Sequence, residues 1–481
     1  MKFIFTSIVS LAIGFNCVAQ SFNNKSIDAL KNETDTNIQS GYDAYKKIAL
    51  SIWDYAELGY KEHKSSALLQ STLKDNGFKL DVGVAGMPTA FVATYGSGSP
   101  VIAILAEYDA LPGLSQDNSS TKTLIANKNN GHGCGHHLFG TGSVAAGIAV
   151  KKLLEAGKIK GTIKVFGCPA EEGGSGKVYM VREDLFNNVD IVLHWHPGDN
   201  NSVTYTSSLA NKSAKFRFYG IASHASMSPE QGRSALDAVE AMNNMVNMMR
   251  EHVPQETRIH YVITNGGKAP NVVPEFAEVY YYVRHPDKTM AVSIFDRITK
   301  AAEGAALGIG TKTDYEIIGG THDLLINKVL ATNMQTNLEK VGGVVYTAEE
   351  NAFAKTMQTS FLEKFPPIDN ARVITTLHLE KDQGSTDVGD VSYVVPTVGL
   401  KTATWVPGTS AHSWQAVACG GTDIGIKGMI VAAKTMAFTA VDLFTNPELI
   451  KKAKQEFLQS KADYQYKALL GDRKPALNYR D

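Results

Sequence analysis

Two kinds of hydrophobic pattern divide the chain. Residues 101–106, 162–168 and 189–193 are short, almost entirely apolar runs, which is typical of strands buried on both faces of a parallel sheet. Residues 214–218 and 277–284 instead alternate between apolar and polar positions, so they predict strands with one buried face and one solvent-exposed face. The first pattern favours an α/β domain, and the second favours a separate, half-exposed sheet.

Helical patterns fill the intervals between the predicted strands. Residues 26–74 carry apolar side chains at intervals of three and four, and residues 141–156 and the alanine-rich stretch 424–444 also predict helices. A capping box at 234–237 opens a further helix between the two alternating strands. Charged residues within 424–444 argue against a membrane-spanning role for that segment.

These patterns predict an α/β protein of two domains, because 481 residues are too many for one compact domain. The larger domain, built on the buried strands, comprises residues 20–206 and 322–447. An α+β domain is inserted at residues 207–321. Residues 448–481 form a tail that we expect to be a peripheral helix and a loose end.

The first residues predict export. Met1 and Lys2 precede an apolar stretch that is short for a membrane span, and Cys17 to Gln20 present small residues where a signal peptidase cleaves. We therefore expect residues 1–19 to be a signal peptide and the protein to be periplasmic or secreted. The alternative is a retained N-terminal anchor.

Composition narrows the choice of partners. A formal net charge of -1, with 43% hydrophobic and 20% charged residues, gives no basic field that would attract nucleic acid. The mature chain would keep three scattered cysteines, Cys134, Cys168 and Cys419, which do not make a disulfide framework. We therefore expect no nucleic-acid partner and no stable membrane insertion.

The strongest chemical signal is the segment GHGCGHH at residues 131–137. It offers one thiol and three imidazoles among glycines, which let neighbouring side chains converge on one point. Because a Cys-x-His pair cannot complete a metal shell, further ligands must come from elsewhere in the chain. Candidates occur where the predicted buried strands end, the edge at which α/β sheets bind ligands. With one residue from a later loop, the candidate set is Asp109, Cys134, His136, Glu171, Glu172, His194, His196 and His412.

Three other interpretations of these residues are weaker. Residues 173–177, GGSGK, resemble a phosphate loop, but Glu171 stands where its first glycine belongs and Val178 where Ser or Thr should follow. A cysteine nucleophile paired with His136 gives no reason for the adjacent glutamates. A binding domain without metals would be expected to have lost several ligands, and they are all present.

Six motifs in this order, GHGCGHH, CPAEEGGSGK, LHWHPG, ASHAS, PNVVP and GTSAHSWQ, resemble those of the M20 family of metallopeptidases and amidohydrolases. The resemblance implies a catalytic α/β sheet domain with an inserted α+β lid and dimerisation domain. It also implies a dinuclear-metal hydrolase that uses two divalent ions, zinc or manganese. The implied substrate is an N-acyl or N-aroyl amino acid, such as an aminobenzoyl glutamate, and an M20-type dipeptidase or carboxypeptidase is the alternative.

The resemblance also assigns roles residue by residue. Glu171 matches the general base, and Asp109 matches the residue that orients a ligand. His196 is preferred to His194 as the ligand from the third buried strand. Glu107 stands where many relatives carry a histidine, which leaves a ligand at that position open. The implied metal ligands are Cys134, His136, Glu172, His196 and His412.

In the inserted domain the resemblance points to three further residues. His224, in ASHAS, matches a histidine that reaches the active site of the partner and stabilises the oxyanion of the tetrahedral intermediate. Asn271, in PNVVP, and Arg284 match substrate-binding residues, and an arginine can hold a carboxylate through paired hydrogen bonds. The alternative for Arg284 is an ordinary surface residue. The implied assembly is a homodimer with shared active sites, or a pairing with a related subunit.

Overall fold

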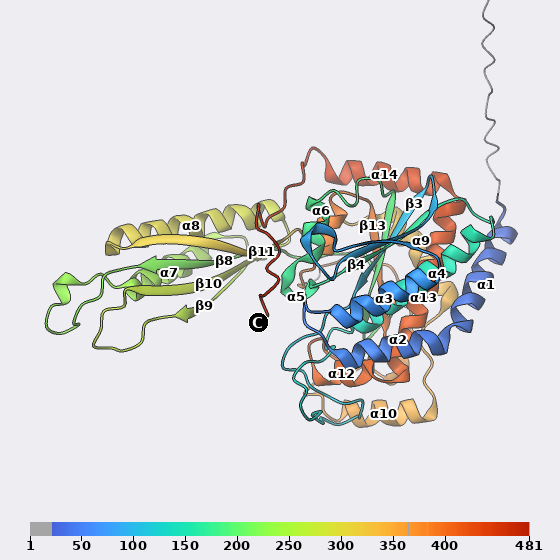
Figure 1. The fold of residues 1–481 in the computed structure, drawn as a ribbon, viewed down its shortest axis with the longest axis horizontal. Coiled ribbons are helices and arrows are strands. Elements are labelled where there is room, and N and C mark those ends of the chain that lie inside the picture. Colours follow the sequence, from blue (N-terminus) through green and yellow to red (C-terminus); the bar gives the residue numbers. More distant parts are fainter. Residues whose placement is uncertain (1–21, 364, 382, 481) are drawn as a thin grey trace, which may run out of the picture.

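Seven strands form the central sheet of the larger domain (Figure 1). The computed structural model describes residues 22–363, 365–381 and 383–480, so the expected signal peptide lies outside the described residues. The strands are β1 (Lys79–Val82), β2 (Phe91–Ser97), β3 (Val101–Glu107), β4 (Gly161–Cys168), β5 (Ile191–Gly198), β6 (Ser202–Thr204) and β13 (Thr397–Ala403). Their order is β1-β2-β4-β3-β5-β13-β6. The four central strands run parallel, whereas β2 and β6 run antiparallel to their neighbours.

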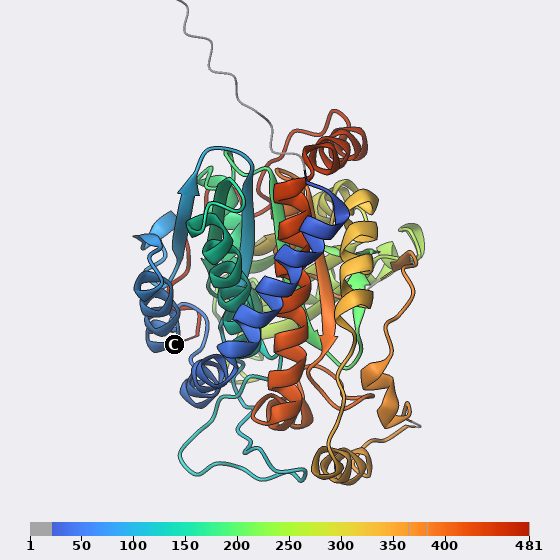
Figure 2. The ribbon, with the colours of Figure 1, turned by 90° about the vertical axis from the view of Figure 1, so that its right-hand side faces the viewer.

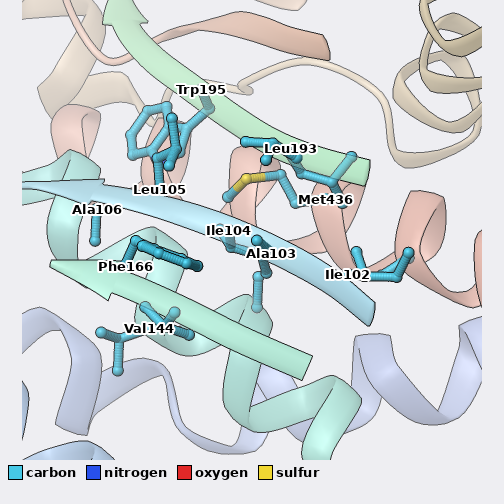
Figure 3. Packing of buried hydrophobic residues seen from close by; sticks show 14 of the residues in the cluster. Ile102, Ala103, Ile104, Leu105, Ala106, Val144, Phe166, Leu193, Trp195 and Met436 are labelled. Atoms are coloured by element: carbon cyan, nitrogen blue, oxygen red, sulfur yellow. The ribbon is translucent and has the colours of Figure 1, made fainter. Parts of the chain in front are cut away.

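The strand β3 lies at the centre of the core, as its apolar run predicted. Its side chains from Ile102 to Ala106 are fully buried between β4 and β5. Leu193 and Trp195 of β5 pack in the same cluster (Figure 3). Since alternate side chains of a strand point to opposite faces, a run without polar residues means that both faces are covered.

Helices pack on one face of this sheet in two layers. Against the strands lie α3 (His63–Asp75), α4 (His136–Glu155) and α13 (Asp423–Thr445), and α1 (Asn24–Ser40) and α2 (Tyr42–Tyr55) pack on α4 and α13. Figure 2 shows α4, α1 and α13 packed side by side. By length and composition α13 could cross a membrane, but 83% of its apolar window is buried inside the protein, as in a core helix.

A second sheet of four antiparallel strands forms the lid domain, which projects to the left of the central sheet in Figure 1. Its elements are β8 (Ala210–Tyr219), α7 (Ala235–Met249), β9 (Arg258–Asn265), β10 (Phe276–His285), α8 (Lys288–Ile309) and β11 (Lys312–Thr321), and the strand order is β11-β8-β10-β9. Every second residue of β10 is buried against the helices. The prediction of an α/β sheet domain with an inserted α+β domain is therefore confirmed.

The remaining elements complete the fold. The helices are α5 (Glu171–Gly174), α6 (Gly176–Arg182), α9 (Lys328–Val341), α10 (Ala348–Gln358), α11 (Val388–Ser392), α12 (Trp414–Gly420) and α14 (Pro447–Lys461), and the 3-10 helices are η1 (Val84–Gly86), η2 (Pro229–Gln231), η3 (Arg250–His252) and η4 (Ile368–Arg372). Two short strands, β7 (Thr206–Ser207) and β12 (Glu380–Lys381), pair in parallel.

The tail contradicts one expectation. The predicted peripheral helix is present as α14, but residues 464–480 are not a loose end. The Tyr466 hydroxyl donates a hydrogen bond of 2.9 Å to the buried Asp390 carboxylate, and the Arg182 guanidinium donates to the Gly471 carbonyl at 3.1 Å. This segment has no regular secondary structure, so its sequence carries no periodicity from which such docking could be predicted.

Candidate metal centre

The thiol and the first imidazole of the candidate site come from the turn that opens α4. Gly135 caps this helix with a φ of +74°, and a Cβ atom there would come within 2.7 Å of Pro197. Glycine is therefore required both by the left-handed backbone and by the close approach of β5. The turn holds Cys134 and His136 beside the carboxyl ends of β4 and β5, where the sequence predicted that the ligands gather.

Among the described residues, three groups of side chains come close enough to hold a metal ion, with their ligand atoms within 4.8 Å of one another. Cys134 Sγ lies 3.4 Å from His196 Nε2, and His412 Nε2 lies 3.0 Å from Glu172 Oε1. The groups are Cys134 with His136 and His196, Cys134 with Glu172 and His412, and Glu107 with His136 and Glu171. The first two share the Cys134 thiol, so this residue would contribute to both groups. The structure brings together all five predicted ligands.

The environment of these groups fits cations. Within the described residues, the buried atoms His136 Nε2 and Glu172 Oε1 make no hydrogen bond, and each has another candidate ligand beside it, Glu107 Oε2 at 3.1 Å and His412 Nε2 at 3.0 Å. A cation between such groups would satisfy both members of each pair. Burial, together with the negative charges of Glu107 and Glu172, raises the pKa of Glu171 well above its usual value. A divalent ion would neutralise this crowded cluster.

Asp109 orients two of the candidate ligands. One oxygen of its carboxylate lies 2.8 Å from His136 Nδ1, and the other accepts the Glu172 backbone N–H at 2.9 Å. The first contact leaves His136 Nε2 to face the cluster, which is the usual arrangement around a histidine ligand. This position agrees with the orienting role that the resemblance implies.

His194 and His196 differ in their surroundings. Both line the cavity described below, but only His196 belongs to a ligand group among the described residues. Burial and the nearby His136 charge hold the pKa of His196 well below its usual value, so its imidazole is neutral, as a ligand must be. Burial and the Lys177 charge lower the pKa of His194 to about 3.

The other two histidines of the central motif face away from the cluster. His132 Nε2 contacts the Ile52 carbonyl at 3.0 Å, and His137 Nε2 contacts the Gly420 carbonyl at 3.0 Å. Both rings are fully buried, and their centres lie 4.8 Å apart. These two contacts hold the turn on the side that faces away from the ligand cluster.

Sequence reasoning missed a buried ion network next to the cluster. The Lys177 ammonium lies 2.6 Å from Glu107 and 2.7 Å from Asp387, and the Lys177 backbone N–H donates to the same aspartate at 2.9 Å. All three side chains are almost completely buried. The signal available was a lysine in the otherwise apolar segment KVYMV. Glu107 stands at the position where many relatives carry a histidine. Its carboxylate pairs with Lys177 and also lies 3.1 Å from His136 Nε2.

A cavity of about 670 Å³ opens between the metal centre and the lid domain. The ligand cluster forms one wall, and Asn211, Ser213, Tyr282 and Arg284 from β8 and β10 contribute to the other. The guanidinium of Arg284 lies 5.6 Å from the Tyr282 ring centre, and its Nε is buried without a hydrogen-bond partner in the part of the chain that the structure describes. Arg284 therefore lines the candidate site and is not an ordinary surface residue.

His224 and Asn271 lie at the opposite end of the lid. Neither is buried, and they sit in loops beyond the ends of β8 and β10 that are farthest from Arg284. Ten-residue strands at about 3.3 Å per residue put these loops about 30 Å from the cavity. His224 Nδ1 accepts the backbone N–H groups of Ser226 and Met227, at 3.3 and 3.2 Å, so its hydrogen is on Nε2.

Known proteins share both the sequence and the fold of this chain. The family model described as peptidase family M20/M25/M40 matches residues 103–359. One of the subunits of p-aminobenzoyl-glutamate hydrolase from Escherichia coli (strain K12) is 42% identical over 452 residues, which cover 88% of this chain and 94% of that protein. Xaa-Arg dipeptidase of Mus musculus is 29% identical over 448 residues, which cover 90% and 93%.

Two solved structures share the fold at low sequence identity. An aminobenzoyl-glutamate utilization protein from Klebsiella pneumoniae has a TM-score of 0.60 at 17% identity and covers 85% of this chain and 98% of its own. A dinuclear metal binding peptidase of family M20 from Bacillus subtilis has a TM-score of 0.57 at 17% identity and covers 84% and 99%. Taken with the family model and the relative at 42% identity, these matches establish that the chain belongs to peptidase family M20/M25/M40 and is a metal-dependent hydrolase.

Proposed function

We propose that the protein hydrolyses the amide bond of N-acyl or N-aroyl amino acids, with an aminobenzoyl glutamate as the leading candidate. One observation carries the proposal. Two ligand groups that share Cys134 face Arg284 across a single cavity, with Glu171 beside them. The name of the 42% identical relative, which belongs to a p-aminobenzoyl-glutamate hydrolase, supports this substrate class.

The chain supplies a mixed set of ligands for two ions. A thiolate, neutral imidazoles and a carboxylate suit zinc, and we propose zinc or manganese. Divalent ions held there would act as Lewis acids on the amide carbonyl and lower the pKa of the attacking water. The proposed ligands are Cys134, His136, Glu172, His196 and His412.

Glu171 is the proposed general base. It lies outside the two groups that share Cys134, so with ions bound in those two groups its carboxylate would stay uncoordinated and could take a proton from the attacking water. It then delivers that proton to the nitrogen of the leaving amine. Because Glu172 is the next residue along the chain, the proposed ligand and the proposed base lie on the same short helix, α5.

Arg284 is the proposed partner of the substrate carboxylate. Its guanidinium lines the cavity from the lid, and its Nε lacks a partner among the described residues. A carboxylate can accept two parallel hydrogen bonds from a guanidinium. Such a contact would place the amide of a short acyl amino acid next to the metal centre.

The proposed assembly is a homodimer with shared sites. The edge strand β9 exposes Tyr261, Val262 and Ile263, and an open apolar edge is a template for pairing with another chain. Met245 and Met248 on α7 are exposed as well. A second copy would bring its own histidine of the ASHAS motif, with a hydrogen on Nε2, to the oxyanion, and its asparagine of the PNVVP motif to the substrate. A related subunit could use the same edge.

Substrate screening of metal-reconstituted protein tests the proposed function. N-aroyl and N-acyl glutamates should be cleaved faster than their amidated counterparts, and exhaustive chelation should abolish turnover. Preferred cleavage of dipeptides would favour the second candidate, a dipeptidase, to which the similarity with Xaa-Arg dipeptidase points. Full turnover with no metal in elemental analysis would refute the proposal. We also propose that the protein is exported, which N-terminal sequencing of the mature chain would test.

A further inference from the structure

The tail runs from the base of the lid to the metal centre. Arg473 donates a hydrogen bond to the Ile318 carbonyl of β11, and the Tyr479 ring packs edge-on against Tyr60, with ring centres 5.6 Å apart. Gly59 leaves room for this contact, since a Cβ atom there would lie 2.2 Å from the Tyr479 hydroxyl. Residues 464–480 therefore follow a defined path on the catalytic domain.

The path ends on the backbone of the candidate ligand Glu172. Its carbonyl oxygen accepts a hydrogen bond of 2.9 Å from the Tyr479 hydroxyl and one of 2.6 Å from the Arg480 guanidinium. Its N–H group donates to Asp109 on the other side. The tail thus completes the fixation of a residue whose side chain belongs to the metal cluster.

The backbone at Glu172 and Gly173 departs from regular helix geometry. Glu172 has φ and ψ of -70° and 67°, and Gly173 has a φ of +91°, so the short helix α5 is bent where the ligand and base project. A backbone hydrogen bond of 3.0 Å, from the Gly174 N–H group to the Ala170 carbonyl, spans this bend, and the tail adds its two hydrogen bonds to the Glu172 carbonyl. A charged donor such as a guanidinium makes a stronger hydrogen bond to a carbonyl than a neutral donor does.

We propose that Tyr479 and Arg480 are positioning residues, which hold the Glu171–Glu172 segment so that the Glu172 carboxylate meets the second ion and Glu171 meets the substrate. This inference rests on the proposed role of Glu172 as a ligand. Arg480 also lines the cavity, so the tail forms part of the wall of the active site.

Calorimetric titration of metal-free protein with Zn²⁺ alone tests the inference. Wild type should bind two ions. Arg480→Ala should weaken one of them about tenfold, the size of one lost hydrogen bond from a charged donor, and leave the other unchanged. Arg480→Lys keeps a charged donor and should restore most of this affinity, and Tyr479→Phe should have a smaller effect.

Kinetics and matched variants separate positioning from general stability. Arg480→Ala should lower kcat about tenfold with KM and thermal stability unchanged, because the residue acts through Glu172. Lys474→Ala, a change in the same segment away from Glu172, is the control and should match wild type. The inference fails if Arg480→Ala binds both ions as wild type does, or if it loses both together with thermal stability. Glu172→Gln is the reference, because wild-type binding of both ions by that variant would overturn the proposed ligand set instead.

Discussion

Two histidines, one in the candidate metal centre and one at the far end of the lid, have opposite surroundings. His136 in the metal centre is completely buried, and its Nδ1 is held by Asp109 at 2.8 Å. His224 at the tip of the lid is not buried, and its Nδ1 accepts hydrogen bonds from its own loop. The first region finds its partners within one chain, whereas the second presents a donor outward. Burial and distance, rather than residue type, thus distinguish His136, which is complete within one chain, from His224, for which we propose a role in a second chain.

The largest expected effect is loss of the base in the buried region. Glu171→Gln should lower kcat about 10⁴-fold, because the amide cannot accept a proton. Metal content, measured by elemental analysis, should stay at the wild-type level. If the variant loses metal instead, Glu171 is a ligand and its proposed role is wrong.

The ion network of Lys177, Glu107 and Asp387 is buried, whereas the ion pair of Lys215 and Glu278 on the lid is partly exposed. Lys177→Met would remove the buried ammonium that pairs with both Glu107 and Asp387, so we expect a loss of about 3–5 kcal/mol in the free energy of unfolding. Lys215→Met is the matched control, since Lys215 pairs with Glu278 at 3.4 Å on the partly exposed surface of the lid and should cost at most about 1 kcal/mol. Denaturant unfolding measures both. Equal losses would mean that the burial of the network has no energetic consequence.

The proposed dimer surface is tested by adding charge to the lid edge. The double variant Val262→Lys and Met248→Lys should be monomeric in sedimentation, and kcat should fall about 100-fold because the oxyanion donor of the partner is lost. Leu307→Lys serves as the control, because Leu307 on α8 is 86% exposed and belongs to the domain without lying on β9 or α7. A monomer with full activity would show that each chain is complete by itself.

The smallest expected effect is on substrate binding by Arg284, at the end of the lid that lines the cavity. Arg284→Ala should raise KM for a free-acid substrate about tenfold, with a smaller change in kcat, because one charged contact to the carboxylate is lost. Arg284→Lys should recover part of that loss. An unchanged KM, or equal cleavage of amidated substrates by wild type, would remove Arg284 from the proposed carboxylate site.

Much of the fold and the wider set of candidate ligands could be predicted from local sequence, and the resemblance to the M20 family narrowed that set to five. Continuous apolar runs located β3, β4 and β5, and the segments that follow the first two, with the turn that opens α4, bring Asp109, Glu172 and Cys134 to one edge of the sheet. The residues His194 and His196 lie within β5, so periodicity could not choose between them; the short distance of His196 from Cys134 favours His196.

Contacts between distant segments could not be predicted in the same way. Asp387 joins Lys177 across more than 200 residues of chain and follows the segment GST, which carries no signal of burial. Tyr479 and Arg480 reach Glu172 only because the tail follows an irregular path over the catalytic domain. Such contacts depend on tertiary packing, and local pattern does not encode them.

The most direct test of the shared site mixes two inactive variants, Glu171→Gln and His224→Ala, under conditions in which protomers exchange. Random pairing makes about half of the dimers mixed, and each mixed dimer has one site that combines an intact Glu171 with an intact histidine from the other protomer, so about one quarter of wild-type activity should return. Native mass spectrometry would establish that exchange has taken place. Proven exchange without recovery of activity would rule out the shared site, because it would mean that His224 does not act across the dimer.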